Sequence, residues 1–398
     1  MDNRHIVGID IGTSTIKAFI GKGMEDGTVF IAGNGTIPTV GITKGTITDV
    51  EALAIAISQA VECAVMATHI SVKEAYIGLG GVGMSSINSI GSISPSTTDA
   101  ISHADIKRVC QAAVLGSVPD DHEVLHVLPQ FFLVDKQKQF HSPLQKKCAH
   151  LEVEAHIVSM PKSILHTLIH AVEKLGIHVT GIVANHIVTS QIFTPANIEN
   201  YVLMDIGAGT TELILVCDKQ IKVSTALPLG GHYITSDIMN GFEISYEHAE
   251  EIKKYYSRLD KNLQGKKIML DCNGYGTIDK QFSYDFLYDI VESRIEEIVY
   301  LVHEYLKSTK EMSKIEKIFL TGGCGAMLNI GDRIEQLFGI PVQEVDLNEI
   351  LPEYASHANF ACYGVLTYAV NHTPNAPVVA NNNGWRVLVD KFKNFLNS

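Results

Sequence analysis

The chain has 398 residues, and its 31 Lys and Arg against 44 Asp and Glu give a formal net charge of -13 at pH 7. With 46% hydrophobic and 19% charged residues it has a globular composition, which excludes a disordered or fibrous chain; about 150 residues per domain predicts two or three lobes. Because Lys and Arg are scattered and outnumbered, we expect no nucleic-acid partner.

Several features favour a cytoplasmic protein without a transmembrane segment. The N-terminus lacks the apolar core and cleavage site of a signal peptide. The most apolar long window, residues 52–67, falls short of the roughly 20 apolar residues of a spanning helix. The cysteines are dispersed without a C-x-x-C pair, so we expect reduced thiols and neither a zinc nor a redox site. They are Cys63, Cys110, Cys148, Cys217, Cys272, Cys324 and Cys362.

The first elements in the chain predict a β-hairpin, a helix and a further strand. Residues 6–10 and 16–20 are apolar and rich in β-branched side chains, with the turn Gly-Thr-Ser-Thr between them at 12–15. Alanines and apolar spacing predict a helix over 51–69, and 74–79 has the pattern of a strand.

From residue 84 to 160 the pattern changes, and we expect an inserted subdomain there. Its predicted elements are strands over 85–93, 123–134 and 151–158 around a helix over 103–115. The core domain then resumes with an amphipathic helix over 161–175, which has Pro near its first turn, and with a buried strand over 177–183.

The opening pattern returns in the second half of the chain. Residues 201–205 and 211–217 predict strands that flank a turn at 206–209. Asp205 occupies the strand end that Asp10 occupies in the first copy, and each is followed by Ile-Gly. A repeat at this spacing indicates a domain duplication, which predicts two related α/β halves.

The remaining elements complete the second half. Helices predicted over 246–259 and 284–306 bracket a strand-like stretch at 265–282, which we expect to form a small accessory subdomain. A strand over 315–320 runs into a Thr-Gly-Gly-Cys-Gly turn and then a helix. Residues 371–383, with two Pro and five Asn, lack periodicity and predict a linker.

The two predicted hairpins suit a polyphosphate. A strand, a tight Gly-containing turn and a second strand direct backbone N–H groups into one concavity, which binds anionic oxygens. Asp10 and Asp205 could each hold Mg²⁺ through water. One copy alone is typical of an ordinary hairpin, whereas two matched copies predict a clamp. The turn at 321–325 suits adenine or its ribose, although taken alone it is equally typical of a plain strand-to-helix turn.

This order of motifs resembles the superfamily of actin, sugar kinases and heat-shock chaperone ATPases, and within it the FtsA family of bacterial cell-division proteins. The resemblance spans nearly the whole chain. It lies in VGIDIGTSTIKAFIGK at 7–22, EVLHVLPQFFLVD at 123–135, YVLMDIGAGTTEL at 201–213, LPLGGHYITSDI at 227–238 and IFLTGGCGAML at 318–328. The hairpins occur across the superfamily, whereas EVLHVLPQ within an insert is particular to FtsA-like proteins.

The resemblance implies an α/β, actin-like duplicated ATPase fold with an FtsA-type inserted subdomain, 1C, and a small accessory subdomain, 2B. The implied boundaries are 1–83 for 1A (first part), 84–160 for 1C, 161–198 for 1A (continued), 199–240 for 2A (first part), 241–307 for 2B, 308–352 for 2A (continued), 353–370 for the closing helix of 1A, 371–383 for a linker and 384–398 for an amphipathic membrane-targeting helix.

The resemblance also implies ATP and Mg²⁺ as ligands. The implied phosphate-binding residues, besides the two aspartates, are Gly12, Thr13, Ser14 and Lys17 in the first hairpin and Gly207, Gly209, Thr210 and Thr211 in the second. Gly230 and Gly231 would line the same cleft, Glu250 and Lys253 would reach the ribose and base, and Gly322, Gly323 and Gly325 would back the adenosine. Without the motif order, Glu250 and Lys253 would be a solvated helical pair.

Two departures from the family pattern affect these expectations. Residues 143–151 replace a P-x-G-M-x-G-x-R-L-like run, which puts the partner surface of the insert in doubt. Residues 185–190 contain no carboxylate where other superfamily members place a water-orienting Gln or Glu. We therefore expect weak or absent ATP hydrolysis and nominate no general base.

The last residues predict an amphipathic helix that binds an anionic membrane. Its apolar stripe is Trp385, Leu388, Val389, Phe392, Phe395 and Leu396, and its cations are Arg386, Lys391 and Lys393. The alternative is a terminal helix docked on the protein body. The Asn-rich linker and the Trp beside basic residues favour the membrane interface, and FtsA-like proteins are similar in ending this way.

The resemblance implies a scaffold that polymerises on the cytoplasmic face of the inner membrane at the division site. Its implied partners are the FtsZ C-terminal tail through 2B, further copies of itself, later division proteins through 1C and anionic lipid. One alternative is a pilus-assembly protein of the same fold. The other is a sugar or metabolite kinase that uses the same phosphate clamp.

Two motif matches carry no function. The G-x-G-x-x-G match at 78–83 precedes a predicted strand, whereas a dinucleotide site requires a helix. His166 and His170 have the spacing of a zinc pair but lack the Glu of a zinc protease, so we expect a plain surface or core pair.

Overall fold

The structure is a computed structural model that describes residues 5–24, 28–43, 46–66, 68–81, 83–95, 100–256, 267–268, 282–327, 329–348, 350–351, 354 and 356–372. The predicted membrane helix at 384–398 lies outside the described residues, as do Cys272 and the predicted linker beyond residue 372.

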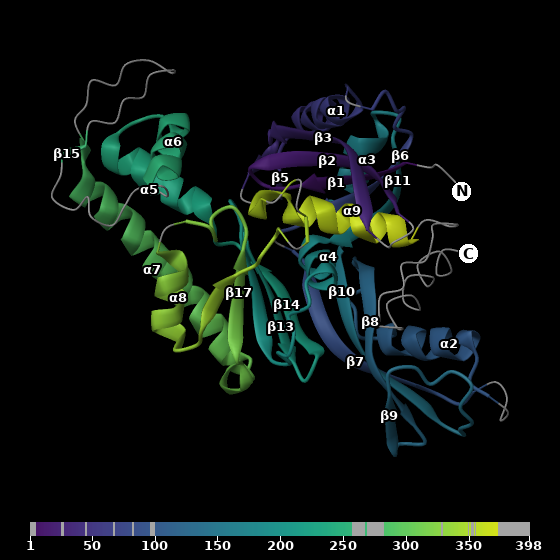
Figure 1. Ribbon diagram of the computed structural model, residues 1–398. Coiled ribbons are helices and arrows are strands. Elements are labelled where there is room, and N and C mark those ends of the chain that lie inside the picture. The colour runs from purple at the N-terminus through teal and green to yellow at the C-terminus, as the bar shows by residue number, and fades with distance from the viewer. Residues whose placement is uncertain are drawn as a thin grey trace.

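Two five-stranded sheets with the same topology carry the two halves of the fold (Figure 1). The first half has the order β11 (His178–Ala184), β6 (Glu74–Leu79), β1 (Ile6–Ile11), β2 (Thr15–Gly23) and β3 (Val29–Pro38). The second half has the order β18 (Val342–Glu344), β17 (Lys317–Thr321), β12 (Tyr201–Ile206), β13 (Thr211–Cys217) and β14 (Gln220–Leu227).

The pairing of the strands matches between the halves as well. β1 pairs antiparallel with β2 and parallel with β6, and β12 pairs antiparallel with β13 and parallel with β17. Both hairpins therefore leave their sheets at the same place. The duplication predicted from the repeated Asp-Ile-Gly is confirmed.

Helices cover both faces of the first sheet. The helices are α1 (Val50–Met66) and α3 (Lys162–Glu173) on one face, and α4 (Asn185–Ile192) and α9 (Phe360–His372) on the other. Because the sheet is buried on both faces, β1 is almost continuously apolar. α4 lies between the halves, since Ile187 shares a core with Leu203 and Ile214 of the second sheet.

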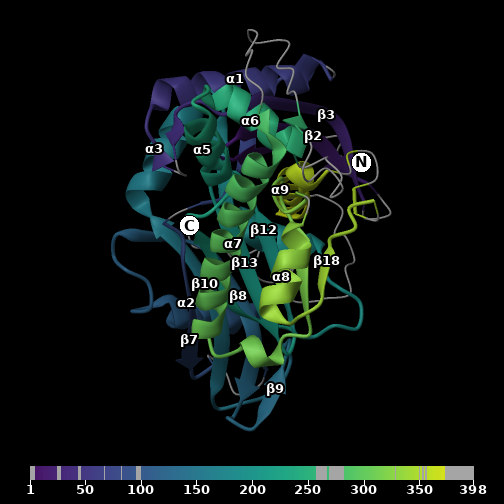
Figure 2. The same ribbon diagram turned by 90° about the vertical axis from the view of Figure 1, so that its left-hand side faces the viewer.

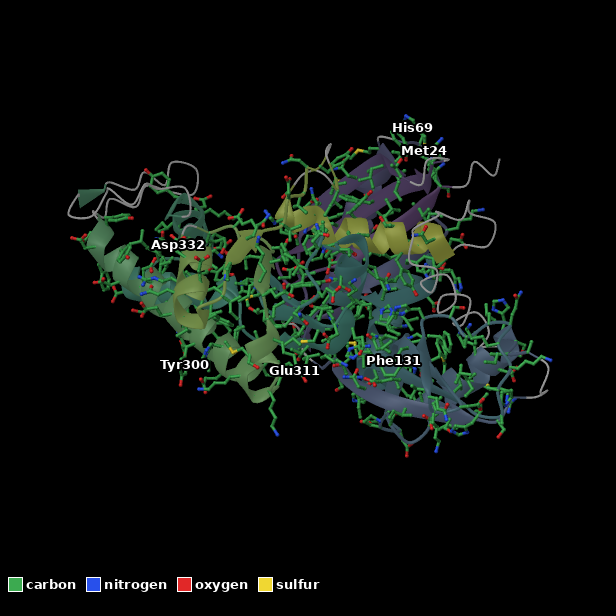
Figure 3. The ribbon with its side chains drawn as sticks, turned by 60° about the horizontal axis from the view of Figure 1, so that its bottom comes forward. Met24, His69, Phe131, Tyr300, Glu311 and Asp332 are labelled. Carbon is green, nitrogen blue, oxygen red and sulfur yellow. The ribbon has the colours of Figure 1, made fainter. Side chains whose placement is uncertain are left out.

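The face of the second sheet turned away from α4 shares one apolar core with four helices, which are labelled in Figure 2. They are α5 (Gly231–Phe242), α6 (Tyr246–Tyr256), α7 (Tyr284–Ser308) and α8 (Ile330–Phe338). In Figure 3, Tyr300 on α7 and Asp332 on α8 lie far from Met24 and His69 of the first half. The small elements are β4 (Ile42–Thr43) with β5 (Thr46–Ile47), β15 (Lys267–Ile268) with β16 (Phe282–Ser283), and the short helices Met312–Lys314 and His357–Asn359.

The predicted insert is a four-stranded antiparallel sheet with one helix and a core of its own. Its elements are β7 (Ser85–Ile93), α2 (His103–Val114), β8 (His122–Val134), β9 (Lys138–Phe140) and β10 (Leu151–Pro161). Ser102 and Asp105 begin α2 with a reciprocal capping box, in which each side chain accepts the backbone N–H of the other residue. The insert lies beside β13 and β14 (Figure 1).

The structure differs from the sequence predictions at several helix ends. α1 ends at Met66 rather than at 69, because His69 adopts a left-handed φ of 57°. α9 includes residues 371 and 372, which we assigned to the linker. α4 and α5 were not predicted. The described cysteines are all free, and all but Cys63 are buried.

Candidate functional site

The two hairpin turns have one geometry. The backbone N–H of Gly12 donates to the carbonyl of Thr15 at 3.1 Å, and that of Gly207 donates to Thr210 at 2.9 Å. Each turn lies directly after a strand that ends near its aspartate. The duplicated sheets therefore present two equivalent loops.

These loops face one another across a pocket of about 330 Å³. The pocket is lined by residues of both halves: Asp10, Gly12, Thr13, Ser14, Thr15, Lys17, Gly80, Asn185, Asp205, Gly207, Ala208, Gly209, Thr210, Glu212, Glu250, Lys253, Lys254, Gly322, Gly323, Cys324, Met327, His357, Ala358 and Ala361. The structure thus brings together most of the residues that the resemblance implies.

The loops approach so closely that Gly209 admits no side chain. A Cβ at Gly209 would lie 2.6 Å from the Thr13 Oγ1 and 2.9 Å from the Thr13 Cβ. Contacts below 3.0 Å require one partner to move. The absence of a side chain at Gly209 is therefore what allows the two hairpins to meet.

Asp10 has polar partners from two neighbouring elements. The Asn185 Nδ2 donates to its Oδ1 at 2.8 Å, and the Lys17 Nζ lies 4.0 Å from its Oδ2. Burial nevertheless raises the pKa of Asp10, although Lys17 and Asn185 oppose the shift. The pocket therefore disfavours the charged form of this carboxylate unless more positive charge is present.

Asp205 shows the same effect more strongly. Burial raises its pKa to about 8, and the negative charges of Glu212 and Asp10 add to the shift. Asp10, Asp205 and Glu212 line the same pocket, and Lys17 lies beside Asp10, so a divalent cation would fit the excess of negative charge there. No cluster of three or more metal-ligating side chains occurs among the described residues.

Glu212 is one of the pocket residues that the sequence analysis missed. It is 6% exposed and pairs with Asp205 across β12 and β13, as Lys17 pairs with Asp10 across β1 and β2. Its Oε1 lies 2.1 Å from the position of a Cβ on Gly80, so Gly80 makes room for it. The signal was available, because Glu212 follows its aspartate by the same spacing as Lys17.

A buried histidine lies behind Glu212. The His186 Nδ1 is 3.6 Å from the Glu212 Oε2, and neither ring nitrogen of His186 has a hydrogen-bond partner among the described residues. The Asn185 Oδ1, also buried, lacks one as well. A carboxylate such as that of Glu212 can act as a general base if a water molecule lies within hydrogen-bond reach of it. The pocket therefore contains a candidate base, which the segment 185–190 does not supply.

Glu250 and Lys253 of α6 form a network that reaches into the pocket. Lys253 is 5% exposed. Its Nζ donates to the Glu250 Oε2 at 2.6 Å and to the Thr235 Oγ1 at 2.9 Å. Burial opposes ionisation of Glu250, but Lys253 and Thr235 together hold its pKa below the ordinary value. The pair is not a solvated surface pair.

Four of the implied residues lie behind the pocket wall instead of lining it. They are Thr211, Gly230, Gly231 and Gly325. The Thr211 hydroxyl donates to the Leu229 carbonyl at 2.8 Å, and the Gly231 N–H donates to the Gly207 carbonyl at 3.0 Å. These hydrogen bonds connect the second hairpin to the start of α5.

Three residues from the short helix before α9 and the start of α9 also line the pocket. They are His357, Ala358 and Ala361. The His357 Nδ1 lies 3.0 Å from the Thr321 hydroxyl at the end of β17. The segment that precedes α9 is thus joined to the second sheet at the base of the pocket.

The two motif matches set aside from the sequence form neither a dinucleotide site nor a zinc site among the described residues, although Gly80 of the first match lines the pocket. β7 follows residues 78–83, which confirms a strand where a dinucleotide site would need a helix. His166 and His170 are exposed on α3. In the described parts of the chain, no helix combines the length and apolar character needed to cross a membrane.

Comparison with known families gives two matches. The family described as "Cell division protein FtsA" matches residues 202–362, and the "SHS2 domain inserted in FTSA" matches 81–159. Cell division protein FtsA of Bacillus subtilis is 31% identical over 331 residues, which cover 82% of this chain and 75% of that protein. That of Pseudomonas aeruginosa is 28% identical over 372 residues, 90% of this chain and 89% of that protein.

Solved structures show the same fold at low sequence identity. The PilM–PilN type IV pilus biogenesis complex matches with a TM-score of 0.65 and 14% identity over 91% of this chain and 97% of that chain. MreB 5 of Spiroplasma citri bound to AMPPNP matches with a TM-score of 0.52 and 14% identity, over 92% and 95% respectively. The predicted actin-like ATPase fold is confirmed.

Proposed function

This chain belongs to the FtsA family of cell division proteins, and on that premise we propose that it is an ATP-binding filament protein of the bacterial division site. It polymerises on the cytoplasmic face of the inner membrane, tethers FtsZ there and recruits later division proteins. The fold implies nucleotide binding, and the choice of ATP with Mg²⁺ belongs to the proposal.

The proposal is carried by the facing hairpins. Two equivalent loops approach from opposite halves, and residues of both loops line the pocket together with Lys17, where phosphates would lie. Glu250 and Lys253 line the other part of the pocket, where a ribose and base would lie against the glycine turn at 322–323. This arrangement suits a nucleoside polyphosphate.

The carboxylates of the pocket fit a magnesium ion. Mg²⁺, when bound, supplies the positive charge that offsets the phosphates and the carboxylates around them. Asp10 and Asp205 would hold it through water, and its positive charge would oppose the burial that raises their pKa values. Glu212 would accept a proton from water in slow hydrolysis.

The accessory subdomain suits a peptide partner. We assign binding of the FtsZ tail to the region 241–307, of which the structure describes residues 241–256, 267–268 and 282–307. Tyr255 and Phe286 are apolar side chains that are 46% and 47% exposed there. Exposed apolar side chains of this kind suit the apolar residues of a docked peptide. The insert is assigned to later division proteins.

The membrane contact is assigned to residues 384–398, which lie outside the described residues. Support for it comes from the sequence alone, in the apolar stripe and the cations Arg386, Lys391 and Lys393. The two alternatives have less support. The likeness to the PilM–PilN complex, at 14% identity, concerns the fold alone, and the family matches favour FtsA over a kinase.

Electron microscopy of the full chain on an anionic lipid monolayer tests the proposal. With ATP and Mg²⁺ we expect ordered filaments on the lipid, and a peptide with the FtsZ C-terminal tail should bind to them. Protein that binds ATP yet forms no filament, or that transfers phosphate stoichiometrically to a sugar, would contradict the scaffold.

A further inference from the structure

The insert contacts the second half through a compact set of polar groups, which we call the clasp. It consists of Ser86, Asn88, Gln130, Glu154 and His156 of the insert and of Ile221, Lys222 and Ser224 of β14. The Ser86 hydroxyl donates to the Ser224 carbonyl at 2.6 Å, and the Asn88 Nδ2 donates to the Lys222 carbonyl at 2.8 Å. The Gln130 Oε1 accepts the Ile221 N–H at 2.7 Å.

His156 lies at the centre of the clasp and is fully buried. Its Nδ1 is 2.8 Å from the Asn88 Oδ1, and its Nε2 is 2.7 Å from the Ser224 hydroxyl. Since the Asn88 amide donates to Lys222, its oxygen must accept from His156. Nδ1 therefore carries the ring proton, and Nε2 accepts from Ser224. The hydrogen bonds that Ser86, Asn88 and His156 make to β14 form only while the insert and β14 stay together.

The insert is attached to the first half in a different way. It is joined to it by the chain at both ends, and Leu125, Val158 and Met160 belong to the same apolar core as β1. The His126 Nε2 accepts the buried N–H of Ala184 at 2.9 Å. That core also includes Ile214 and Val216 of β13, so what distinguishes the first half is the covalent connection at both ends of the insert. The clasp is thus the side of the insert that can open.

β14 also connects the clasp to the nucleotide pocket. It pairs along its length with β13, placing Ser224 opposite Ile214 and Ala226 opposite Glu212. In the first half, His186 lies beside Glu212. Burial is the main cause that lowers the pKa of His156, and the charge of His186 is the second cause. A movement of the second hairpin relative to the first must therefore move β14 relative to the insert.

We propose that the clasp couples nucleotide binding to the position of the insert. Closure of the two hairpins on a nucleotide keeps β14 against β7 and β10, and opening of the pocket separates them. The inference rests on the proposed nucleotide binding. Because coupling between two sites is reciprocal, a broken clasp must weaken nucleotide binding by the same factor by which the nucleotide stabilises the clasp.

The test compares the full-length protein with the variant Ser86→Ala/Asn88→Ala. Neither residue lines the pocket. In the wild type, saturating ATP with Mg²⁺ should slow amide hydrogen exchange in both hairpins and also in β7, β10 and β14. In the variant the hairpins should still respond, the three clasp strands should not, and the Kd for ATP should rise about fivefold or more.

Ser85→Ala/Ser89→Ala is the matched control. These serines lie on the same strand at the alternate positions, on the side away from β14. The control should keep the wild-type Kd and the wild-type response of the clasp strands. Wild-type behaviour of Ser86→Ala/Asn88→Ala in both measurements would overturn the coupling. Hairpins that show no response to ATP in the wild type would instead contradict the nucleotide proposal itself.

A milder pair of variants covers the case in which the first variant fails to fold. The Lys222 Nζ lies 3.6 Å from the Glu154 Oε1 at the edge of the clasp. Glu154→Lys places like charges there and should raise the Kd for ATP by a smaller factor. Adding Lys222→Glu restores opposite charges and should restore the Kd. An unchanged Kd in Glu154→Lys would count against the proposal.

Discussion

Two side chains at equivalent positions of the duplicated hairpins have opposite charges. Lys17 pairs with Asp10 and Glu212 pairs with Asp205, each across the first two strands of its sheet. Both are less than a tenth exposed and line the same pocket. The duplication therefore gives the cleft a cation suited to a phosphate and a carboxylate suited to a water molecule, from one structural position used twice.

Glu212→Gln should lower the rate of ATP hydrolysis by about 10²- to 10⁴-fold, the usual contribution of a positioned base. The amide keeps the shape of the side chain but cannot accept the proton of water. Glu62→Gln on α1, outside the pocket, is the matched control. Phosphate release under single-turnover conditions measures the rate. Equal rates in Glu212→Gln and the wild type would exclude Glu212 as the base.

The burial of His156 makes the clasp sensitive to acid. Burial lowers its pKa from 6.5 to about 3, so the folded state keeps this histidine neutral while the unfolded chain protonates it. Stability is therefore complete above pH 6.5 and decreases as the pH falls toward 3. Between pH 7 and pH 5 the loss from this residue is about 2 kcal/mol.

Urea unfolding at the two pH values checks this prediction. His156→Asn should be less stable than the wild type at pH 7, but its own loss between pH 7 and pH 5 should be smaller by about 2 kcal/mol. Other groups titrate in both proteins and cancel in the comparison. An equal loss in both proteins would mean that His156 is not held neutral.

At the scale of elements, the strands and the amphipathic helices could be predicted from the sequence. Apolar runs and period-3.6 spacing identified the two hairpins, α1, α2, α3, α6 and α7. α4 escaped because its first six residues are all buried, so it has no polar face to reveal a helical period. α5 escaped because it begins at Gly231, directly after Gly230.

The candidate site was predictable to the extent that its residues belong to motifs. Most of the hairpin glycines and aspartates line the pocket as expected. Glu212 was missed because the family pattern points to residues 185–190 for a water-orienting side chain, whereas the strand register brings Glu212 into the pocket from β13. The placement of Thr211 and Gly231 behind the wall follows from hydrogen bonds between elements, which sequence spacing does not show.

Gly209→Ala should lower the affinity for ATP by about tenfold, or about 1.4 kcal/mol. The new methyl would meet three atoms of Thr13 within 3.0 Å and hold the hairpins apart. Thr13→Gly removes all three atoms, so the double variant should recover part of the affinity. Isothermal titration with ATP and Mg²⁺ measures the effect.

Gly331→Ala on α8 is the control for Gly209→Ala. Its new methyl would meet Val342 at 3.7 Å, an ordinary contact, far from the pocket lining. It should bind ATP as the wild type does. Wild-type affinity in Gly209→Ala would mean that the hairpins need not meet when nucleotide binds.

For the whole molecule, we predict that the proposed terminal helix binds a membrane through many linked copies rather than through one. Three cations near the end of the chain contribute at most about 1 kcal/mol each at an anionic surface. A helix of this length must also become ordered when it binds. Linking copies in a filament raises the avidity by roughly 10²- to 10⁴-fold. Polymerisation and membrane attachment should therefore depend on each other.

Deletion of the residues after Asn383 should separate these properties. The truncated chain should fold and bind ATP with the wild-type Kd, because the described residues that line the pocket all precede residue 362. It should no longer sediment with anionic vesicles, whereas the full chain should do so in the presence of ATP. The variant Lys391→Glu/Lys393→Glu keeps the apolar stripe, so it should lose less sedimentation with vesicles than the deletion does. Raised salt screens the lysines of the wild type, so the variant and the wild type should sediment more alike at high salt. Sedimentation of the truncated chain at the wild-type level would place the membrane contact elsewhere in the molecule.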